Sequence, residues 1–337
     1  MQAPHATDIS RGNDSAQRAQ VRVGFHPASQ LGEALRSDRT LAVFGFGLEA
    51  REEQDPRWLH VPLADAGPGR IELWRSAQPV RHGRTGAVRW SENGNVLFGS
   101  LEPDEDGRDL ADTTADAYAT LSAFLASSGF PYLLRTWNYL DAVTAGDGDD
   151  ERYRRFCIGR ARGWTLRDGE FPAATCIGRH DGRRRLQLAW LAARTPGRPL
   201  ENPRQTSAYR YPRQYGPQAP SFARALLPAA SSEVPLLLSG TAAIVGHASQ
   251  HPGALEQQLD ETLVNLQHLI DAARPHATHV EPGFAADTAL RIYVRNEADM
   301  ATVAERFRQR FGHIPHLVLN AEICRPELLV EIEGVHA

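Results

Sequence analysis

An internal repeat limits the folds open to this chain, because the same kinds of element occur twice in the same order. Each half is predicted to contain a β-hairpin, a helix, a strand, a second helix and two further strands. The two copies lie about 145 residues apart, a spacing typical of a duplicated domain rather than of a solenoid repeat. We therefore predict an α/β (α+β) fold in which each copy forms a mixed sheet with two helices.

The repeat also divides the chain into segments. Polar residues 1–20 predict a mobile tail, and residues 21–194 contain the first copy with extra strands at its start. The stretch 195–221 is rich in Tyr, Arg and Pro and has no regular period, and a loop of this length in a compact protein is usually functional or disordered. Residues 222–337 contain the second copy.

Apolar spacing predicts two helices in each copy. They are expected at 109–128 and 151–167 in the first copy, and at 253–274 and 300–311 in the second. Short apolar runs predict the strands, and IELWRS at 71–76 is taken as the first strand of the first copy. Equivalent strands of the two copies are therefore expected at equivalent positions of their sheets.

Composition excludes several classes of function. Hydrophobic residues make up 42% of the 337 residues, which is enough for a buried core, and no apolar run is long enough to span a membrane. The net charge of −4 gives nucleic-acid binding no support. All 37 basic residues are arginine, which excludes Schiff-base chemistry at lysine and leaves arginine to bind anions. The start of the chain has no apolar segment typical of a secretion signal, so we expect a cytoplasmic protein.

Neither a metal site nor a disulfide framework is predicted. The three cysteines are odd in number and widely spaced, and Cys157 and Cys176 are expected to lie in the core. His247 and His251 have helical spacing, but a proline follows them directly and no third ligand is apparent. We therefore expect chemistry without a metal.

Two glutamates in the last predicted strand, LLVEIEGV, are candidates for acid–base chemistry. Alternate residues of a strand share a face, so Glu331 and Glu333 point the same way. The equivalent strand of the first copy, LQLAWLA, has Ala189 and Leu191 instead. Carboxylates that one copy has and the other lacks favour a single site, although a strand facing solvent shows the same alternation. Spacing alone does not separate Glu331 from Glu333.

Arginines and tyrosines gather in segments that suit the binding of a carboxylate. The predicted helix ERYRRFCIGRARG includes Arg155 beside a phenylalanine, and the loop YRYPRQY includes Tyr211 and Tyr215. Arg224 follows on the next strand, and small residues in SGTAAIVG, including Gly240, indicate a close approach by another group. A solvated helix face, a packing loop and a tightly packed helix would explain the same patterns.

These motifs resemble known families. The segments FPAATCIGR with LQLAWLA, and HIPHLVLNAEICRPELLVEIEG, are similar to the YjgF/RidA family, whose members assemble as trimers with ligand sites between subunits. With YRYPRQYGPQAPSFARA, SGTAAIVGH and ICRPELLVEIEG, nearly the whole chain after the polar tail is similar to the chorismatases, which are built as fused YjgF-like domains. The resemblance implies duplicated YjgF/RidA-like domains that form a pseudo-trimer-like single chain.

The resemblance also implies a reaction and roles for residues. Chorismate carries two carboxylates and an enolpyruvyl ether, and a chorismatase releases pyruvate from it without a cofactor. Glu331 is implied as the general acid and Arg155 as a substrate contact. Cys324, in the turn before the last strand, resembles the cysteine of the hydroxybenzoate-forming enzymes, although a small buried side chain also explains it. The other residues expected to contact the substrate are Tyr211, Tyr215, Arg224 and Gly240.

Three functions stay open. The first is a chorismatase that forms 3-hydroxybenzoate, 4-hydroxybenzoate or both. The second is a hydrolytic chorismatase that forms a dihydroxycyclohexadiene carboxylate, against which Cys324 and Gly240 argue. The third is a YjgF/RidA-like protein that binds metabolites or hydrolyses imines, against which the Tyr- and Arg-rich loop argues. The expected partner is chorismate, with no nucleic acid and no membrane, and the protein is expected to be a monomer or a small homo-oligomer.

Overall fold

Two six-stranded sheets with the same strand order confirm the predicted duplication. The computed structural model describes residues 21–49, 53–164 and 170–337, and the tail predicted over 1–20 lies outside them. The first sheet has the order β5 (Arg81–Thr85), β6 (Val88–Glu92), β7 (Val96–Leu101), β10 (Gln187–Ala193), β8 (Tyr132–Asp141) and β9 (Ala173–Arg179). The second has the order β11 (Arg198–Leu200), β12 (Ala225–Leu227), β13 (Leu236–Ala242), β18 (Val330–His336), β16 (Ala289–Val294) and β17 (His316–Asn320). Each sheet ends in one parallel pair, β8–β9 or β16–β17.

The N-terminal strands form a third sheet that repeats the inner part of the other two. Its order is β1 (Arg22–Pro27), β4 (Arg70–Arg75), β2 (Thr40–Phe46) and β3 (Trp58–His60). Its pairs are antiparallel, antiparallel and parallel, as in β7-β10-β8-β9. The described residues therefore form two complete copies and one truncated copy, the trimer-like arrangement expected for this chain. The strand predicted at 71–76 as the first of the first copy is instead β4, whose residues pair with β1 and β2.

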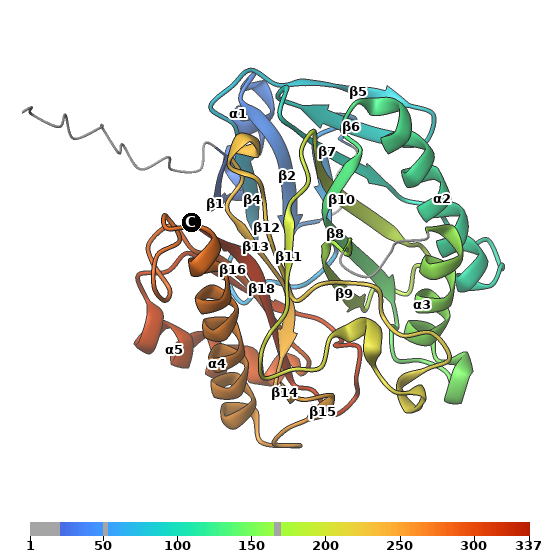
Figure 1. Cartoon of the computed structure of the whole chain (residues 1–337), viewed down its shortest axis with the longest axis vertical. Helices are drawn as coiled ribbons and strands as arrows, with labels where there is room; N and C mark the ends of the chain where they lie inside the picture. The colour runs from blue at the N-terminus through green and yellow to red at the C-terminus, as the bar shows by residue number, and fades with distance from the viewer. Residues whose placement is uncertain (1–20, 50–52, 165–169) are drawn as a thin grey trace, which may run out of the picture.

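The predicted helices cover the outer faces of the two complete sheets (Figure 1). They are α2 (Leu110–Ser128) and α3 (Arg152–Gly163) in the first copy, and α4 (Leu255–Ala273) and α5 (Met300–Phe311) in the second. The truncated copy has the short helix α1 (Leu31–Arg36). Helix α2 begins after Asp109, whose carboxylate caps it by accepting from the Ala111 N–H at 2.7 Å. Helix α3 ends at Gly163, earlier than predicted, and residues 165–167 of that prediction lie outside the described residues.

The inner faces of the three sheets pack against one another. One buried apolar cluster includes Phe44 of the truncated copy, Trp137 of the first copy and Tyr293 of the second. The outer faces have separate apolar clusters beneath the helices. Since the strands are buried on both faces, a polar side chain on an inner face needs a specific partner or a function.

One connection differs from the prediction, because residues 198–200, expected in a loop, form β11 and pair with β12. The last two strands of each copy do not pair with each other: β17 and β18 lie on opposite sides of β16, as β9 and β10 do around β8. Strand β9 is consequently at the edge of its sheet, where it contacts β13 of the second copy.

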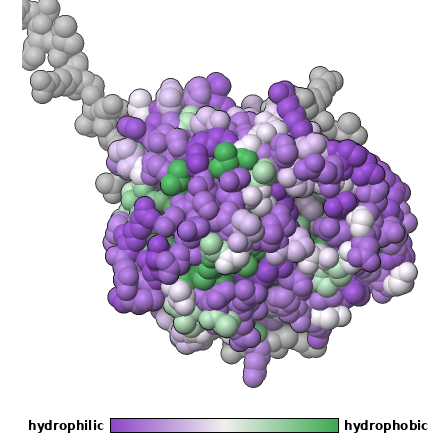
Figure 2. Space-filling view, turned by 90° about the horizontal axis from the view of Figure 1, so that it is seen from below, coloured by the Kyte–Doolittle hydropathy of each residue, from purple (hydrophilic) through white to green (hydrophobic). Residues whose placement is uncertain are grey.

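The outer surface is mostly polar. Figure 2 shows small apolar areas separated by hydrophilic side chains on the face seen from below. Among the described residues, the exposed large hydrophobic side chains are Tyr132, Val245 and Val264. None of the described helices is both long and apolar enough to cross a membrane.

Candidate active site

A buried network of charges lies where the three sheets meet. Glu333 on β18 pairs with Arg135 on β8 of the first copy, and also with Arg291 on β16 of its own copy at 3.0 Å. Glu72 on β4 binds Arg291 through both carboxylate oxygens, at 2.6 and 2.5 Å. Two carboxylates and two guanidinium groups balance one another, which is the condition under which buried charges are tolerated.

Strand register identifies equivalent positions in the three copies. The residues facing each other across the equivalent strands are Glu333 and Arg291, Glu72 and Phe44, and Leu191 and Arg135. Two residues earlier on each strand stand Glu331, Arg70 and Ala189. Arg70 is paired with Asp65 at 3.1 Å and Ala189 is fully buried. The sequence predicted that the second copy has a carboxylate where the first copy has none, and the truncated copy lacks one too. Of the three equivalent residues, only Glu331 is acidic.

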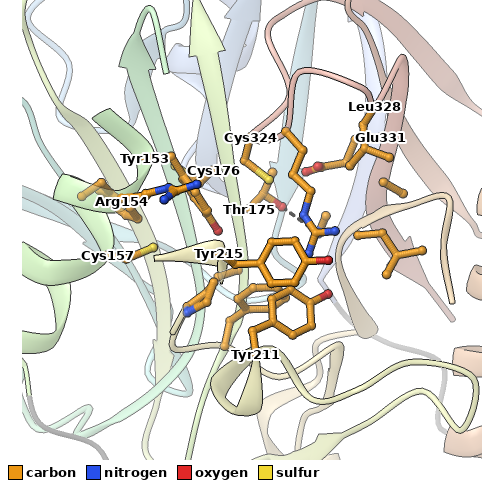
Figure 3. Close-up of a pocket in the computed structure, with 18 of the residues that line it drawn as sticks. Tyr153, Arg154, Cys157, Thr175, Cys176, Tyr211, Tyr215, Cys324, Leu328 and Glu331 are labelled. Carbon is orange, nitrogen blue, oxygen red and sulfur yellow. Dashed lines mark hydrogen bonds between the residues drawn. The ribbon is translucent and has the colours of Figure 1, made fainter. Parts of the chain in front are cut away.

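A cavity of about 330 Å³ lies between the first and second copies, beside this network. Its walls come from α3 and β9 of the first copy, from β13 and β18 of the second, and from loop residues before β12 and β18. Figure 3 shows Glu331 and Cys324 on one side, opposite Tyr211 and Tyr215. The volume suits a small organic molecule. Of the site residues predicted from the sequence, those that line the cavity are Glu331, Cys324, Tyr211, Tyr215, Arg224 and Gly240.

Glu331 presents a protonated carboxyl to this cavity. It is 5% exposed and, within the described part of the chain, no hydrogen bond to its carboxyl is formed. Burial, and then the charge of Glu333, raise the pKa of Glu331 from 4.5 to about 8, although three nearby arginines oppose the change. A group with this pKa is a carboxylic acid at neutral pH and can donate a proton.

Glu333 behaves in the opposite way. Burial alone would raise its pKa, but Arg135 and Arg291, with hydrogen bonds from Thr175 and Tyr293, lower it. Glu333 is therefore a fixed carboxylate that stabilises the junction of the sheets. The geometry favours Glu331 over Glu333 as a proton donor, a choice that spacing left open.

Gly240 makes room for the Glu331 carboxyl. A β-bulge between Leu238 and Thr241 brings Gly240 to the cavity wall. A Cβ atom at position 240 would overlap Oε1 of Glu331 and would lie 3.3 Å from Cγ2 of Thr175. The group that approaches this strand closely, as the small residues predicted, is therefore the Glu331 carboxyl.

All three cysteines line the cavity. Cys157 also belongs to the buried apolar cluster beneath the helices of the first copy, as predicted, and Cys176 packs against that cluster. Burial raises the pKa of Cys324 and of Cys157 to about 12, and that of Cys176 well above 9.0. The three side chains are therefore neutral thiols, which act as small walls with weak hydrogen-bonding capacity rather than as thiolates.

Three arginines line the cavity with N–H groups that have no partner among the described residues. These groups are Nε and Nη2 of Arg160, Nε of Arg224 and Nη2 of Arg325. The guanidinium carbon of Arg160 lies 5.2 Å from the centre of the Tyr118 ring, which holds it in place. Buried donors are normally paired, so these groups suit an anionic ligand such as a carboxylate.

Arg155 lies outside the cavity, contrary to the prediction. Its Nε donates to Asp109 at 3.2 Å beside the start of α2, and its side chain is 30% exposed. Residues four apart share a helix face whereas neighbours do not, so Phe156 and Arg160 face the cavity together while Arg155 turns toward α2. Arg160 therefore lines the cavity, whereas Arg155 does not.

The tyrosine loop is held by two of the cavity arginines. Tyr211 accepts a hydrogen bond from Nη2 of Arg224 at 2.6 Å, and the Arg325 guanidinium carbon lies 3.9 Å from the centre of the Tyr215 ring. The Tyr215 hydroxyl is 3.2 Å from Nδ1 of His247, so this histidine is a hydrogen-bond partner of the tyrosine loop. Within the described ranges, no group of three or more possible metal ligands occurs.

Arg325 and Thr175 also line the cavity, and neither had a role in the sequence analysis. Arg325 follows Cys324 in the ICRP motif, so its position beside a candidate residue is a usable signal. Thr175, in FPAATCIGR, carries no such signal, because its partner Glu333 lies 158 residues further along the chain. A contact between two copies of a duplicated domain is not encoded in local spacing.

A buried carboxyl with a raised pKa and partly unpaired arginines in one small cavity form a candidate site that could bind a small anion and donate a proton to it. Comparison with known proteins identifies the family. Residues 72–192 match the family described as Chorismatase FkbO/Hyg5-like, N-terminal. The chain is 37% identical to a chorismatase of Streptomyces rapamycinicus, over 79% of this chain and 82% of that relative.

Two further comparisons agree. A 3-hydroxybenzoate synthase of Streptomyces hygroscopicus is 34% identical, over 78% of this chain and 80% of its own length. A crystal structure of a chorismatase superposes with a TM-score of 0.83 and 30% identity, covering 94% of this chain and 98% of that one. This chain belongs to the chorismatase family.

Proposed function

We propose that this enzyme converts chorismate into pyruvate and a hydroxybenzoate, with Glu331 as the general acid. The observation that carries the proposal is a carboxyl that faces a cavity between two domain copies and has its pKa raised to about 8. The names of the relatives, chorismatase and 3-hydroxybenzoate synthase, support the substrate and the product.

Binding follows from charge. Chorismate carries two carboxylates, and the cavity offers three arginines with unpaired N–H groups, Arg160, Arg224 and Arg325. We expect these arginines to hold the carboxylates through charge-assisted hydrogen bonds. The hydroxyls of Tyr211 and Tyr215 add polar contacts on the same side of the cavity. Such contacts fix the enolpyruvyl group against Glu331 and so reduce the entropic part of the barrier.

The chemistry begins with transfer of the Glu331 proton to the methylene carbon of the enol ether. The resulting oxocarbenium ion weakens the bond between the ether oxygen and the ring, and its rupture releases pyruvate and leaves a ring cation. Loss of the proton on C4 of the ring then gives 4-hydroxybenzoate. For 3-hydroxybenzoate, the C4 hydroxyl oxygen must first bond to the C3 cation and then break its bond to C4, after which C3 loses its proton. Either route loses one proton from the ring cation in total, and this proton restores the acid. The sum of products equals chorismate, so the route consumes no water, oxidant or reductant. General acid catalysis of this kind is typically worth about 10²–10⁴-fold.

Product choice depends on whether water reaches the ring cation. Addition of water would give the dihydroxycyclohexadiene carboxylate of a hydrolytic chorismatase. Cys324 lines the cavity as a neutral thiol, and a thiol holds water weakly, which favours the anhydrous product. We therefore propose the hydroxybenzoate route, with the dihydrodiol as the alternative.

Incubation with chorismate tests the proposal. We expect one equivalent of pyruvate and one of hydroxybenzoate per chorismate, with the aromatic product identified by chromatography against 3- and 4-hydroxybenzoate. A dihydroxycyclohexadiene carboxylate as the sole product would support the hydrolytic alternative. Unchanged chorismate would contradict both and favour a metabolite-binding or imine-hydrolysing protein.

We also propose that one chain suffices for activity. The residues that line the cavity, Glu331 and the three arginines among them, all belong to one chain. The buried ion pairs where the three sheets meet also form within that chain. Sedimentation analysis with parallel activity assays at increasing dilution tests this. Constant specific activity at dilutions where the protein is monomeric is the expected result, and a loss of activity on dissociation would contradict it.

A further inference from the structure

Thr175 joins the acid-bearing copy to its neighbour directly behind the cavity. It lies on β9 of the first copy, is buried, and forms part of the cavity wall. Its Oγ1 donates to Glu333 and accepts from Nη2 of Arg135 at 2.9 Å and from the N–H of Gly240 at 3.1 Å. Two of these three partners, Glu333 and Gly240, belong to the second copy.

The Thr175 hydroxyl has no hydrogen-bonding site left for a further partner. A hydroxyl has one donor and two acceptor sites, and each of the three is occupied by a different partner. No aliphatic side chain can replace these contacts, and loss of the hydroxyl would leave the Gly240 N–H unpaired at the cavity wall. Serine is the substitution that keeps the same bonding capacity.

The equivalent position of the second copy shows that a hydroxyl is not needed to build the sheet. In the parallel pairs, Thr175 lies opposite Trp137 and Leu319 lies opposite Tyr293, so Thr175 and Leu319 are equivalent. Leu319 is fully buried and apolar. The polar residue therefore occurs in the copy whose strand lies behind the acid, which indicates a role in the site rather than in folding of the domain.

Thr175 influences the Glu331 carboxyl indirectly, in two ways. The first is steric, because Gly240 supplies the space that the Glu331 carboxyl occupies, and the hydroxyl of Thr175 fixes the Gly240 backbone. The second is electrostatic, because the same hydroxyl donates to Glu333, whose negative charge is next to Glu331. Both routes converge on the position and protonation of one carboxyl.

The geometry points to Thr175 as a positioning residue for the acid: its hydroxyl holds Gly240 behind the Glu331 carboxyl and ties Glu333 to Arg135. Thr175 does not itself exchange a proton with the substrate. This inference rests on the proposed function, since the reaction is what reports on the acid.

The test compares Thr175→Val, which keeps the shape but removes the hydroxyl, with Thr175→Ser, which keeps the hydroxyl. We expect Thr175→Val to lower kcat for pyruvate release by about 10–100-fold, less than the roughly 10²–10⁴-fold that general acid catalysis typically contributes, while KM stays near wild type. The alkaline limb of the kcat–pH profile should also move. Thr175→Ser should restore both kcat and the profile.

A matched control distinguishes the positioning role of Thr175 from the general effect of replacing a buried threonine by valine. Thr262 on α4 is buried and its hydroxyl has no partner in the described part of the chain. Thr262→Val should therefore leave kcat, KM and the pH profile at wild-type values. If Thr175→Val fails to fold, Thr175→Ala provides the same comparison, and the same fall in kcat with unchanged KM is expected.

Two results would overturn the inference. One is a folded Thr175→Val or Thr175→Ala protein with wild-type kcat and an unmoved pH profile. The other is a Thr175→Ser protein that is as impaired as Thr175→Val, because shape rather than hydrogen bonding would then be responsible. Wild-type protein that releases no pyruvate from chorismate would instead refute the proposed function itself, so the two failures are distinguishable.

Discussion

Glu331 and Glu333 share one face of β18, yet their surroundings drive their protonation in opposite directions. Burial and a neighbouring carboxylate raise the pKa of Glu331 to about 8, whereas Arg135 and Arg291 outweigh burial at Glu333 and lower its pKa. Pairs of titratable groups pushed apart in this way mark acid and base assignments in enzymes. Here the separation assigns the proton to the carboxyl that faces the cavity and the charge to the one that joins the sheets.

Replacement of Glu331 by glutamine should abolish most of the activity. The amide keeps the shape but cannot donate the proton, so Glu331→Gln should lower pyruvate release by at least about 100-fold. A coupled assay for pyruvate measures this. If Glu331→Gln retains wild-type kcat, Glu331 is not the acid.

Glu333→Gln should act mainly on stability. It removes a buried carboxylate from Arg135 and Arg291, and breaking a buried ion pair costs about 3–5 kcal/mol. Denaturant titration should show this loss, while the folded fraction retains more activity than Glu331→Gln does. The reverse order of the two activities would exchange the roles of the two glutamates.

Activity should decline in alkaline solution. Because the reaction needs the protonated form of Glu331, kcat should be level below about pH 8 and should fall tenfold per pH unit above it. The free energy of unfolding should also decrease as the pH rises. The native pKa of about 8 exceeds the ordinary value of 4.5, so the native state keeps a proton that the unfolded chain loses.

Denaturant titrations over the same pH range test the linkage. The stabilisation that comes from protonated Glu331 is complete below pH 4.5 and is lost as the pH rises through about 8. The stability of wild type relative to Glu331→Gln should therefore decrease over this interval. A difference that is constant with pH would contradict the raised pKa.

Arg160 and Arg155 provide a matched pair on α3. Arg160→Ala should weaken chorismate binding by about 1.5–3 kcal/mol, roughly 10–100-fold in Kd, because a buried carboxylate loses a charge-assisted partner. Arg155→Ala removes an exposed ion pair with Asp109 and should leave kinetics near wild type. Equilibrium binding to inactive Glu331→Gln protein measures both. Equal effects of the two substitutions would show that the cavity is not the binding site.

Cys324→Ala should change the product rather than the rate. A smaller residue leaves room for water beside the ring, so chorismate consumption should continue while the yield of hydroxybenzoate falls. The product ratio at complete turnover, measured for mutant and wild type side by side, is the test. An unchanged ratio at an unchanged rate would remove Cys324 from the mechanism.

The two complete copies could be predicted from the sequence because their signals are local. The apolar stripe of α4, with Leu259, Leu263, Leu266 and Ile270 all buried, has helical spacing in the sequence itself. The truncated copy could not be predicted in the same way. It lacks the first hairpin, and its helix α1 has 6 residues, so its strands look like additions to the first copy.

The residues of the candidate site also differ in whether the sequence could predict them. The glutamate pair on the last strand was predictable, because the first copy has Ala189 and Leu191 at the positions of Glu331 and Glu333, and the resemblance then favoured Glu331. The roles of Glu333 and Thr175 were not, since their partners come from another copy. The resemblance implied Arg155 as a substrate contact, whereas the turn of the helix brings Arg160 onto the face of Phe156 and so to the cavity.

The protonation state of Glu331 is the central claim, and infrared difference spectroscopy measures it directly. The C=O stretch of a protonated carboxylic acid is distinct from that of a carboxylate, and subtraction of the Glu331→Gln spectrum isolates the signal of this residue. We expect a protonated carboxyl at pH 7 that titrates near pH 8. A carboxylate at pH 7, with titration near the ordinary value of 4.5, would contradict the account.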